Sequence, residues 1–292
     1  LNLFKVKIKM NIILISGLSG AGKSTALRIL EDSGFYCVDN LPLTMLEQLA
    51  SIYKSYGYTK IAVGVDTRTS PLLDQLPKSI KVLRNNNIDV RAIYLDASDN
   101  CLLTRFSETR RKHPLSGNLR TVEECIAIER DLLADISLIA HRIDTSNLSA
   151  NALRKIIKEF IDADFKQMNI IVQSFGFKYG LPIDSDFVFD VRCLPNPHYD
   201  KAIREFNGTQ QPIIDFLDKE PSVQNMLNDI YSMTSKWFDE FSSDNRNYLT
   251  IAIGCTGGKH RSVYLTEALS QLIRKNFQYN VIARHRQIIN QH

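Results

Sequence analysis

Two short segments of this chain combine glycines with lysine, arginine or hydroxyl side chains in the way that phosphate-binding loops do. The first segment is Gly17-Leu18-Ser19-Gly20-Ala21-Gly22-Lys23-Ser24, which fits the pattern Gly-x4-Gly-Lys-Ser/Thr. Glycines let such a loop wind so that its backbone N–H groups point at phosphate oxygens. In this pattern Lys23 reaches the terminal phosphates and Ser24 binds Mg²⁺. The segment therefore predicts a site for a nucleoside triphosphate, with Lys23 and Ser24 as its catalytic residues.

The second segment lies near the C-terminus, between the apolar run YLTIAI and an amphipathic helical pattern. Its residues are Cys255, Thr256, Gly257, Gly258, Lys259, His260, Arg261 and Ser262. Backbone N–H groups at the start of a helix bind anions. The segment therefore predicts a second anion site, suited to a phosphate or a phosphosugar.

The spacing of Cys255 and Arg261, with five residues between them and Ser262 directly after, is also that of cysteine-dependent phosphatases. In those enzymes the loop amides and the arginine surround a phosphate above a thiolate, whose pKa they lower. Here Cys255 follows a glycine in place of the customary histidine, and no aspartate can be assigned as the general acid. Binding without covalent chemistry is therefore favoured, and a cysteine phosphatase stays an alternative.

The sequence leaves open which carboxylate completes the metal site. Three aspartates each follow an apolar run that reads as a strand, namely Asp39, Asp66 and Asp96. Each of them is placed so that it can face Mg²⁺ or its bound waters.

A cluster of basic residues follows the fourth apolar run, in the string RFSETRRKHP. Its members are Arg105, Arg110, Arg111 and Lys112. Small-molecule kinases of the P-loop class place a lid here, and the planar guanidinium of arginine binds phosphate oxygens in pairs. A solvated helix end explains the cluster equally well. A P-loop small-molecule kinase is therefore a second alternative function.

The end of the chain is basic, since no acidic residue follows Glu267. Its cationic residues are Arg274, Lys275, Arg284 and Arg286, with His285 among them and two aromatic residues interleaved. Backbone phosphate contacts together with aromatic stacking are typical of RNA binding. The net charge of the whole chain is only +4, so RNA binding would depend on this local patch.

The elements that must position these residues alternate between strands and helices. Four apolar runs, IILIS, FYCV, KIAVGV and RAIYL, are each followed by a helical pattern. This alternation predicts a parallel sheet with helices on both faces, of the P-loop NTPase or kinase type, over residues 10–164. A smaller α/β domain is expected over residues 165–292, with strands in DFVFDVR, YLTIAIG and NVIAR and a long helical run from Pro221 to Phe241. Residues 1–9 are expected to be an N-terminal extension.

Composition excludes several classes of protein. With 44% hydrophobic and 23% charged residues, the chain is neither disordered nor fibrous. The five cysteines are odd in number and never form a Cys-x2-Cys pair, which argues against a disulfide framework or a zinc site and favours a cytoplasmic location. The first residues lack the apolar length of a signal peptide or of a membrane span.

The chain resembles the RNase adapter protein RapZ family of bacterial P-loop nucleotide-binding proteins. The resemblance runs over nearly the whole chain, carried by GLSGAGKSTALRILEDSGFYCVDNLP, TRFSETRRKHPLS, SFGFKYGLPIDSDFVFDVRCLPNPHYD and IAIGCTGGKHRSVY. It implies an ATP site at the first loop and weak hydrolysis of ATP and GTP. It also implies a GTP contact at Asp66, Thr67, Arg68 and Thr69, where Thr69 replaces the family's usual asparagine.

The resemblance further implies a role as an adapter. Family members bind a small regulatory RNA and present it to an endoribonuclease, and they sense glucosamine-6-phosphate, an amino-sugar phosphate. They act as homo-oligomers. Carried over to this chain, the second loop would bind the phosphosugar and the basic end would bind RNA. The chain ends in QIINQH, whereas members of the enteric type continue with further lysines and arginines.

Overall fold

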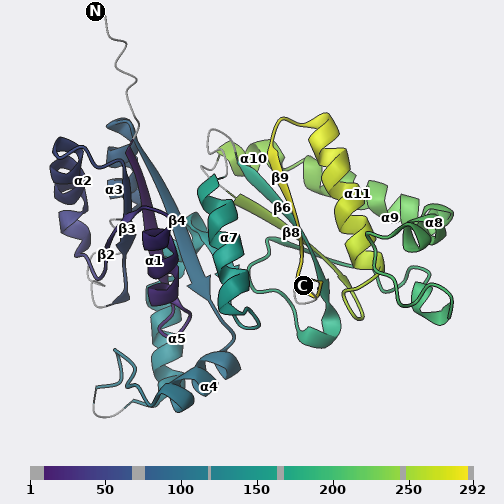
Figure 1. Cartoon of the computed structure of the whole chain (residues 1–292), viewed down its shortest axis with the longest axis horizontal. Coiled ribbons are helices and arrows are strands. Elements are labelled where there is room, and N and C mark those ends of the chain that lie inside the picture. The colour runs from purple at the N-terminus through teal and green to yellow at the C-terminus, as the bar shows by residue number, and fades with distance from the viewer. Residues whose placement is uncertain (1–9, 68–75, 118–119, 163–167, 244–247, 289–292) are drawn as a thin grey trace, which may run out of the picture. The chain divides into compact units, whose positions relative to one another are not determined.

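The computed structural model describes residues 10–67, 76–117, 120–162, 168–243 and 248–288 (Figure 1). The chain divides into two compact units, Leu1–Asp162 and Ala163–His292, close to the boundary expected at 164/165. Each unit has its own sheet and its own helices, and each is described by itself below.

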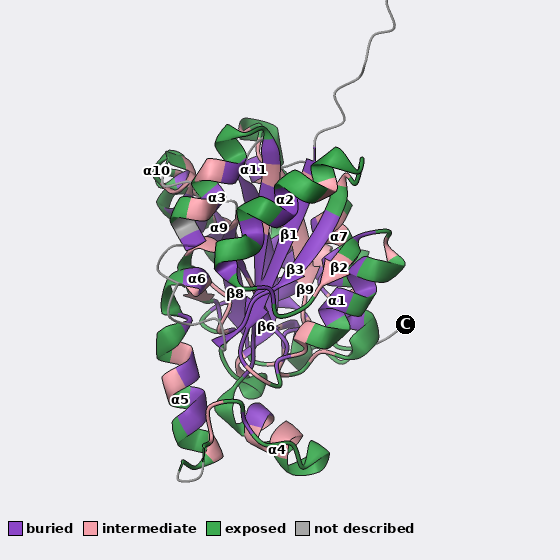
Figure 2. Cartoon of the chain, turned by 90° about the vertical axis from the view of Figure 1, so that its left-hand side faces the viewer, coloured by how far each residue is buried: buried purple, intermediate pink, exposed green. Residues whose placement is uncertain are grey.

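The N-terminal unit contains a five-stranded sheet in the order β2-β3-β1-β4-β5, with every described pair of neighbours parallel. Its strands are β1 (Met10–Gly17), β2 (Tyr36–Val38), β3 (Lys60–Gly64), β4 (Ile88–Asp96) and β5 (His141–Asp144). Central β1 is buried along almost its whole length, as expected of a parallel strand that helices cover on both sides. Figure 2 shows buried strands behind helices that are exposed on their outer faces.

The helices of this unit pack on both faces of the sheet. They are α1 (Lys23–Asp32), α2 (Leu46–Ser55), α3 (Leu76–Asn85), α4 (Asp99–Thr109), α5 (Val122–Leu132), α6 (Ala134–Ile139) and α7 (Ala150–Asp162), with the 3-10 turn η1 (Leu43–Met45) before α2. Helices α1 and α7 contact each other on one face, while α3 contacts α2 and α6 on the other (Figure 1). Helix α5 begins at a capping box, in which Thr121 and Glu124 bond reciprocally to each other's backbone N–H groups.

The C-terminal unit contains a four-stranded parallel sheet in the order β7-β8-β6-β9. Its strands are β6 (Asn169–Gly176), β7 (Phe187–Asp190), β8 (Tyr248–Cys255) and β9 (Asn280–His285). Its helices are α8 (Gln211–Asp218), α9 (Pro221–Ser235), α10 (Phe238–Ser243) and α11 (Arg261–Asn276), with 3-10 turns η3 (Phe177–Tyr179) and η4 (Pro197–Tyr199). The single long helix expected from Pro221 to Phe241 is thus divided into α9 and α10.

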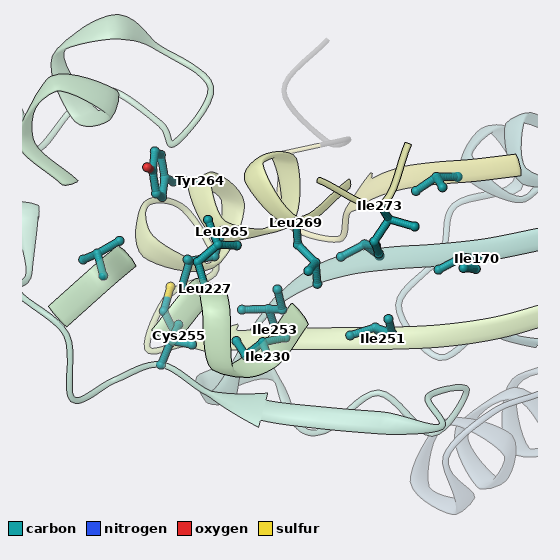
Figure 3. Packing of buried hydrophobic residues seen from close by; sticks show 14 of the residues in the cluster. Ile170, Leu227, Ile230, Ile251, Ile253, Cys255, Tyr264, Leu265, Leu269 and Ile273 are labelled. Atoms are coloured by element: carbon teal, nitrogen blue, oxygen red, sulfur yellow. The ribbon is translucent and has the colours of Figure 1, made fainter. Parts of the chain in front are cut away.

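The core of the C-terminal unit lies between its sheet and two helices (Figure 3). Ile251 and Ile253 of β8 are fully buried against Leu265 and Leu269 of α11 and Ile230 of α9. Burying a side chain of this kind contributes about 1.5–3 kcal/mol. This packing fixes the start of α11 against the end of β8, which is where the second predicted loop lies.

The prediction of two α/β units with parallel sheets is confirmed. Among the described residues, no helix is both long enough and apolar enough to cross a membrane.

Candidate functional site

The first predicted loop, Gly17–Ser24, connects β1 to α1 and is called the P-loop below. Gly17, Gly20 and Gly22 have φ angles of 134°, 87° and 105°, in the region that favours glycine. A Cβ atom on Gly17 would lie 2.1 Å from the Leu95 carbonyl oxygen, so no larger residue fits there. The loop therefore has the winding that presents backbone N–H groups at the start of a helix.

A cavity of about 440 Å³ opens over the P-loop. Lys23 and Ser24 line it from the loop, Asp66 lines it from the end of β3, and Arg111 and Lys112 line it from the segment between α4 and α5. The Lys23 ammonium group donates a hydrogen bond to the Gly17 carbonyl oxygen at 2.6 Å. Arg105 of α4 lines the cavity as well, so the structure brings the predicted catalytic pair together with a carboxylate and three cations of the predicted lid.

Of the three aspartates left open by the sequence, Asp66 is the one that the structure places at the P-loop cavity. Asp96 is fully buried, and its two oxygens accept hydrogen bonds from Arg130 at 2.9 and 3.1 Å and from Arg142 at 2.9 Å. Asp39 is exposed and does not line this cavity. Asp96 therefore holds helix α5 and strand β5 in place, and Asp66 is the acid positioned for the metal.

The residues around the P-loop fit Mg²⁺ by their chemistry. Ser24 and Asp66 offer hydroxyl and carboxylate oxygens, the ligands that Mg²⁺ prefers. The described ranges contain no cluster of three or more His, Cys, Asp or Glu side chains that would form a metal site of protein ligands alone. Mg²⁺ would thus be held by these two residues and by phosphate oxygens, and would neutralise charge on the phosphates.

The predicted GTP contact is only partly described. Asp66 and Thr67 lie at the end of β3, both nearly fully buried, whereas Arg68 and Thr69 lie outside the described residues. The Thr67 hydroxyl donates a hydrogen bond to Glu129 at 3.2 Å. This half of the predicted contact is therefore tied to helix α5.

Arg105 of the predicted lid cluster contacts the P-loop from α4. Its guanidinium donates to the Gly20 carbonyl at 3.0 Å and to the backbone carbonyl of Thr145 at 2.7 Å. Arg105 therefore joins the P-loop to the end of β5. Arg110, with a φ of 51°, ends α4, so that the chain turns there toward Arg111 and Lys112.

Glu129 on α5 is a P-loop contact that the sequence analysis missed. It is fully buried, and its carboxylate accepts hydrogen bonds from the Ser19 backbone N–H at 2.7 Å and the Ser19 hydroxyl at 2.8 Å. His113, which accepts at Nδ1 from the Leu115 N–H, bonds the same carboxylate through Nε2 at 3.1 Å. Burial opposes the charge of Glu129, but the bonds from His113 and Ser19 and the nearby Lys23 outweigh it and lower the pKa.

Replacement of Glu129 by glutamine should destabilise the N-terminal unit. In glutamine an NH₂ group, which donates hydrogen bonds and accepts none, takes the place of one carboxylate oxygen. The buried donors that bond this oxygen would lose their acceptor, at a cost of about 2–3 kcal/mol. Thermal denaturation should show a melting temperature lower by about 5–10 °C. Glu123→Gln, an exposed position on the same helix, is the matched control.

The pH dependence of that loss gives a second test. Because the pKa of Glu129 is lowered in the folded chain, its contribution is complete above the ordinary value of 4.5 and is lost as the pH falls further. The difference between wild type and Glu129→Gln should stay constant at neutral pH and shrink in acid. Equal melting temperatures at pH 7 would contradict the role given to Glu129.

The second predicted loop, Cys255–Ser262, connects β8 to α11 and is called the C-terminal loop below. The Gly258 N–H donates to the Cys255 sulfur at 3.2 Å, and the Ser262 hydroxyl lies 3.2 Å from the same sulfur. A Cβ atom on Gly176 of β6 would lie 2.7 Å from the backbone carbon of Gly257, so this glycine allows the loop to approach the neighbouring strand. Cys255 itself lies at the end of the hydrophobic core (Figure 3).

A cavity of about 520 Å³, called the C-terminal cavity below, opens over this loop. The loop lines it through Cys255, Thr256, Gly257, Lys259, His260 and Arg261. Side chains from three other segments complete the wall, namely Lys178, Tyr179, Asn196, His198, Tyr199, Arg204, Glu205, Gln287 and Ile288. No motif in the sequence indicated a role for these other segments, although Lys178 and His198 stand in the strings that carry the family resemblance.

Arg261 and His260 hold the loop in place. The Arg261 Nη1 donates to the carbonyl oxygens of Arg192 and Leu194, both at 2.8 Å. His260 Nε2 lies 2.9 Å from the Arg204 carbonyl, and burial outweighs that contact and lowers the His260 pKa. His260 is therefore neutral at pH 7, and the cavity's positive charge comes from its lysines and arginines.

The residues proposed from sequence as an RNA-binding segment fall into two groups. Arg274 and Lys275 lie in the last turn of α11, while Arg284, His285 and Arg286 lie at the end of β9. The Arg274 guanidinium bonds the Val281 carbonyl near the start of β9, so about 10–17 Å of strand separates it from the second group. The second group is next to the C-terminal cavity, which Gln287 lines.

Several of these side chains already have partners within the unit. Arg274 donates to the Val281 carbonyl at 2.9 Å. His285 bridges the Ser174 hydroxyl at 2.9 Å and the Glu267 carboxylate at 2.8 Å, and its bond to Glu267 lowers the pKa of that carboxyl. His285 therefore links β9 to α11. Lys275, by contrast, has an exposed side chain.

Comparisons with known proteins agree with this architecture. Residues 10–165 match the model of the RapZ-like N-terminal domain and residues 168–289 match that of the RapZ C-terminal domain. A protein of Chromobacterium violaceum named nucleotide-binding protein is 53% identical over 97% of this chain and 100% of its own length. One of Aromatoleum aromaticum with the same description is 50% identical over 95% of this chain and 94% of its own length.

Solved structures match about half of the chain. A shikimate kinase from Bacteroides thetaiotaomicron covers 53% of this chain and 99% of its own, with 12% identity and a TM-score of 0.37. The two domain models together span nearly all described residues, and the relatives are similar from end to end. This chain therefore belongs to the RapZ family of nucleotide-binding proteins.

Proposed function

We propose that this protein is a nucleotide-binding RNA adapter that senses an amino-sugar phosphate. In this proposal the N-terminal unit binds and slowly hydrolyses ATP or GTP. The C-terminal unit binds an amino-sugar phosphate and a small regulatory RNA, which a homo-oligomer presents to an endoribonuclease. The observation that carries the proposal is the composition of the C-terminal cavity, which combines loop amides with cations and one carboxylate.

The C-terminal cavity suits an amino-sugar phosphate by its charges. Lys178 and Lys259 supply positive charge beside the loop amides, which favours a phosphate dianion. Glu205 is the carboxylate on the same wall and suits the ammonium group of an amino sugar. The cavity volume of about 520 Å³ lies in the range of small-molecule sites.

The hydrolytic step uses the groups around the P-loop. Lys23 would neutralise charge as it develops on the terminal phosphates, and Ser24 and Asp66 would hold Mg²⁺, which would supply further positive charge there. Arg111 and Lys112 line the same cavity and would contact the phosphate that leaves. The same geometry supports the alternative of a small-molecule kinase, for which ATP turnover would rise steeply with one acceptor.

A cysteine phosphatase is less well supported. Such an enzyme needs an acid that protonates the leaving group. The carboxylate on the wall of the C-terminal cavity, Glu205, lies 3.2 Å from Arg204 and 3.8 Å from Lys259, so it is the ion-pair partner of two cations.

Sugar binding can be tested by calorimetry on the full chain. Glucosamine-6-phosphate should bind, whereas glucosamine without the phosphate should not, because the loop amides then have no anion to bind. Glucose-6-phosphate, which lacks the ammonium group, should bind more weakly. Equal binding of the two sugar phosphates would remove the amino-sugar part of the proposal, and no binding of either would overturn it.

RNA binding can be tested through its salt dependence. RNA crosslinked in cells to the wild type is recovered and titrated against wild type, Arg284→Ala/Arg286→Ala and Arg274→Ala/Lys275→Ala at several salt concentrations. Removal of each side chain that binds a phosphate should lower the slope of log affinity against log salt by about 0.7–0.9. Unchanged affinity and slope in both double variants would overturn the assignment of RNA binding to these residues.

A further inference from the structure

Cys255 differs from the other buried cysteine of this chain in what surrounds its sulfur. Cys125, in the apolar interior of the N-terminal unit, has its thiol pKa raised by burial. Burial also opposes ionisation of Cys255, which is 3% exposed, but hydrogen bonds from the Ser262 hydroxyl and the loop amides outweigh it and lower the pKa. The thiol pKa is thus raised at Cys125 and lowered at Cys255, although both side chains are buried. The difference arises because the C-terminal loop directs hydrogen-bond donors at the Cys255 sulfur.

The guanidinium of Arg261 gives a second, independent observation at the same place. Its side chain lines the C-terminal cavity, is only 4% exposed, and uses Nη1 for the carbonyls of Arg192 and Leu194. Its Nη2 faces the Thr256 hydroxyl at 3.5 Å, and its buried Nε has no hydrogen-bond partner among the described residues. On this edge of the guanidinium, Nη2 thus makes one long hydrogen bond to the residue beside Cys255, and Nε is a buried donor without an acceptor among the described residues.

We propose that Cys255 is a site of reversible oxidation by hydroperoxides, and that the oxidised sulfur closes the C-terminal loop to phosphate. The thiolate attacks one peroxide oxygen, so that an S–O bond forms and the O–O bond breaks. The sulfur loses two electrons to the peroxide, whose second oxygen leaves as hydroxide and takes a proton from water. The product is a sulfenic acid, whose oxygen is an acceptor that the unpartnered Nε of Arg261 could bind.

Reversal needs only a small-molecule thiol. The first thiol condenses with the sulfenic acid, forming a mixed disulfide and releasing water, and a second thiol displaces Cys255 as the free thiol. The cavity of about 520 Å³ over the sulfur admits both the peroxide and the reductant. The oxidation itself does not depend on the proposed function, whereas its effect on phosphate binding rests on it.

The test uses the full-length protein, hydrogen peroxide and a dimedone-type probe that labels sulfenic acids, with mass spectrometry of the peptides. At pH 7, Cys255 should be labelled at least about tenfold faster than the exposed Cys193 of the same unit, because a larger fraction of its sulfur is thiolate. Ser262→Ala removes one hydrogen bond to the sulfur with little change of volume and should slow the labelling. Cys193→Ser is the matched control and should leave the labelling of Cys255 unchanged.

Labelling of Cys255 no faster than that of buried Cys125 would overturn the proposal. The phosphate-binding part has its own readout, the binding of inorganic phosphate before and after oxidation and again after reduction. Wild type should lose phosphate binding on oxidation and regain it with a thiol. The affinity of Cys255→Ser for phosphate, whatever its value before treatment, should not change on exposure to peroxide. Rapid labelling in a chain that never binds phosphate would support the oxidation site and contradict the proposed function, so the two failures can be told apart.

Discussion

Replacement of Lys23 by alanine is expected to lower the affinity for ATP and GTP by about 100-fold or more. The Lys23 ammonium group stands at the start of α1, bonded to Gly17 at 2.6 Å, and is the P-loop cation that can reach the terminal phosphates. A charge-assisted contact to phosphate in a partly enclosed site is worth about 1.5–3 kcal/mol, and the loss of charge beside several phosphate oxygens adds to it. Titration with a fluorescent nucleotide analogue measures the effect.

The matched control for this prediction is Arg28→Ala. Arg28 lies on the same helix and is exposed, so its removal changes the net charge equally without touching the P-loop. The control should bind nucleotide like the wild type, and phosphate binding in the C-terminal unit should be the same in both variants. Undiminished nucleotide affinity in Lys23→Ala would refute the assignment of the site to the P-loop.

Replacement of Arg261 by alanine should both destabilise the C-terminal unit and abolish phosphate binding there. The variant leaves the carbonyls of Arg192 and Leu194 without their charged donor, a loss of about 3 kcal/mol or more. The melting temperature should fall by about 8–12 °C. Thermal denaturation and calorimetry with inorganic phosphate measure the two effects.

A folded variant separates binding from stability at this position. Arg261→Lys keeps a charged donor for the carbonyls, so this variant should remain folded. A lysine cannot donate to two carbonyls and a phosphate at once, so the variant should bind phosphate at least about tenfold more weakly. Arg192→Lys, at an exposed arginine of the same unit, should bind as the wild type does. Wild-type phosphate affinity in Arg261→Lys would mean that the Nε and Nη2 edge of Arg261 does not face the anion.

Much of the candidate site could be predicted because its chemistry is local. The P-loop is a strand, a glycine-rich turn and a helix that are contiguous in sequence, so the pattern and its surroundings were both visible from Ile12 to Ser24. The C-terminal loop has the same local construction between β8 and α11. Both loops form where they were predicted, at the carboxyl ends of parallel strands.

Other parts of the site could not be predicted because distant segments form them. Ser19 and Glu129 are separated by 110 residues, and no residue spacing indicates that their side chains meet. Asp66 and Asp96 follow similar apolar runs in the sequence. In the fold, Asp66 lines the P-loop cavity, whereas Asp96 accepts hydrogen bonds from Arg130 and Arg142.

By itself, then, the sequence determined the two α/β units, the position of both glycine-rich loops and the place of Lys23 at the start of the helix after the first loop. These depend on hydrophobic periodicity and on glycine geometry, which act over a few neighbouring residues. Only the tertiary structure decided that Asp66 is the acid at the P-loop, that Glu129 anchors it, and that the basic C-terminal residues form two separate groups. It also showed that Arg261 bonds two backbone carbonyls of its own unit through Nη1 and the Thr256 hydroxyl through Nη2. These contacts depend on which strand ends lie side by side. The strand order of the sheet sets this, and it brings together segments that are far apart in the sequence.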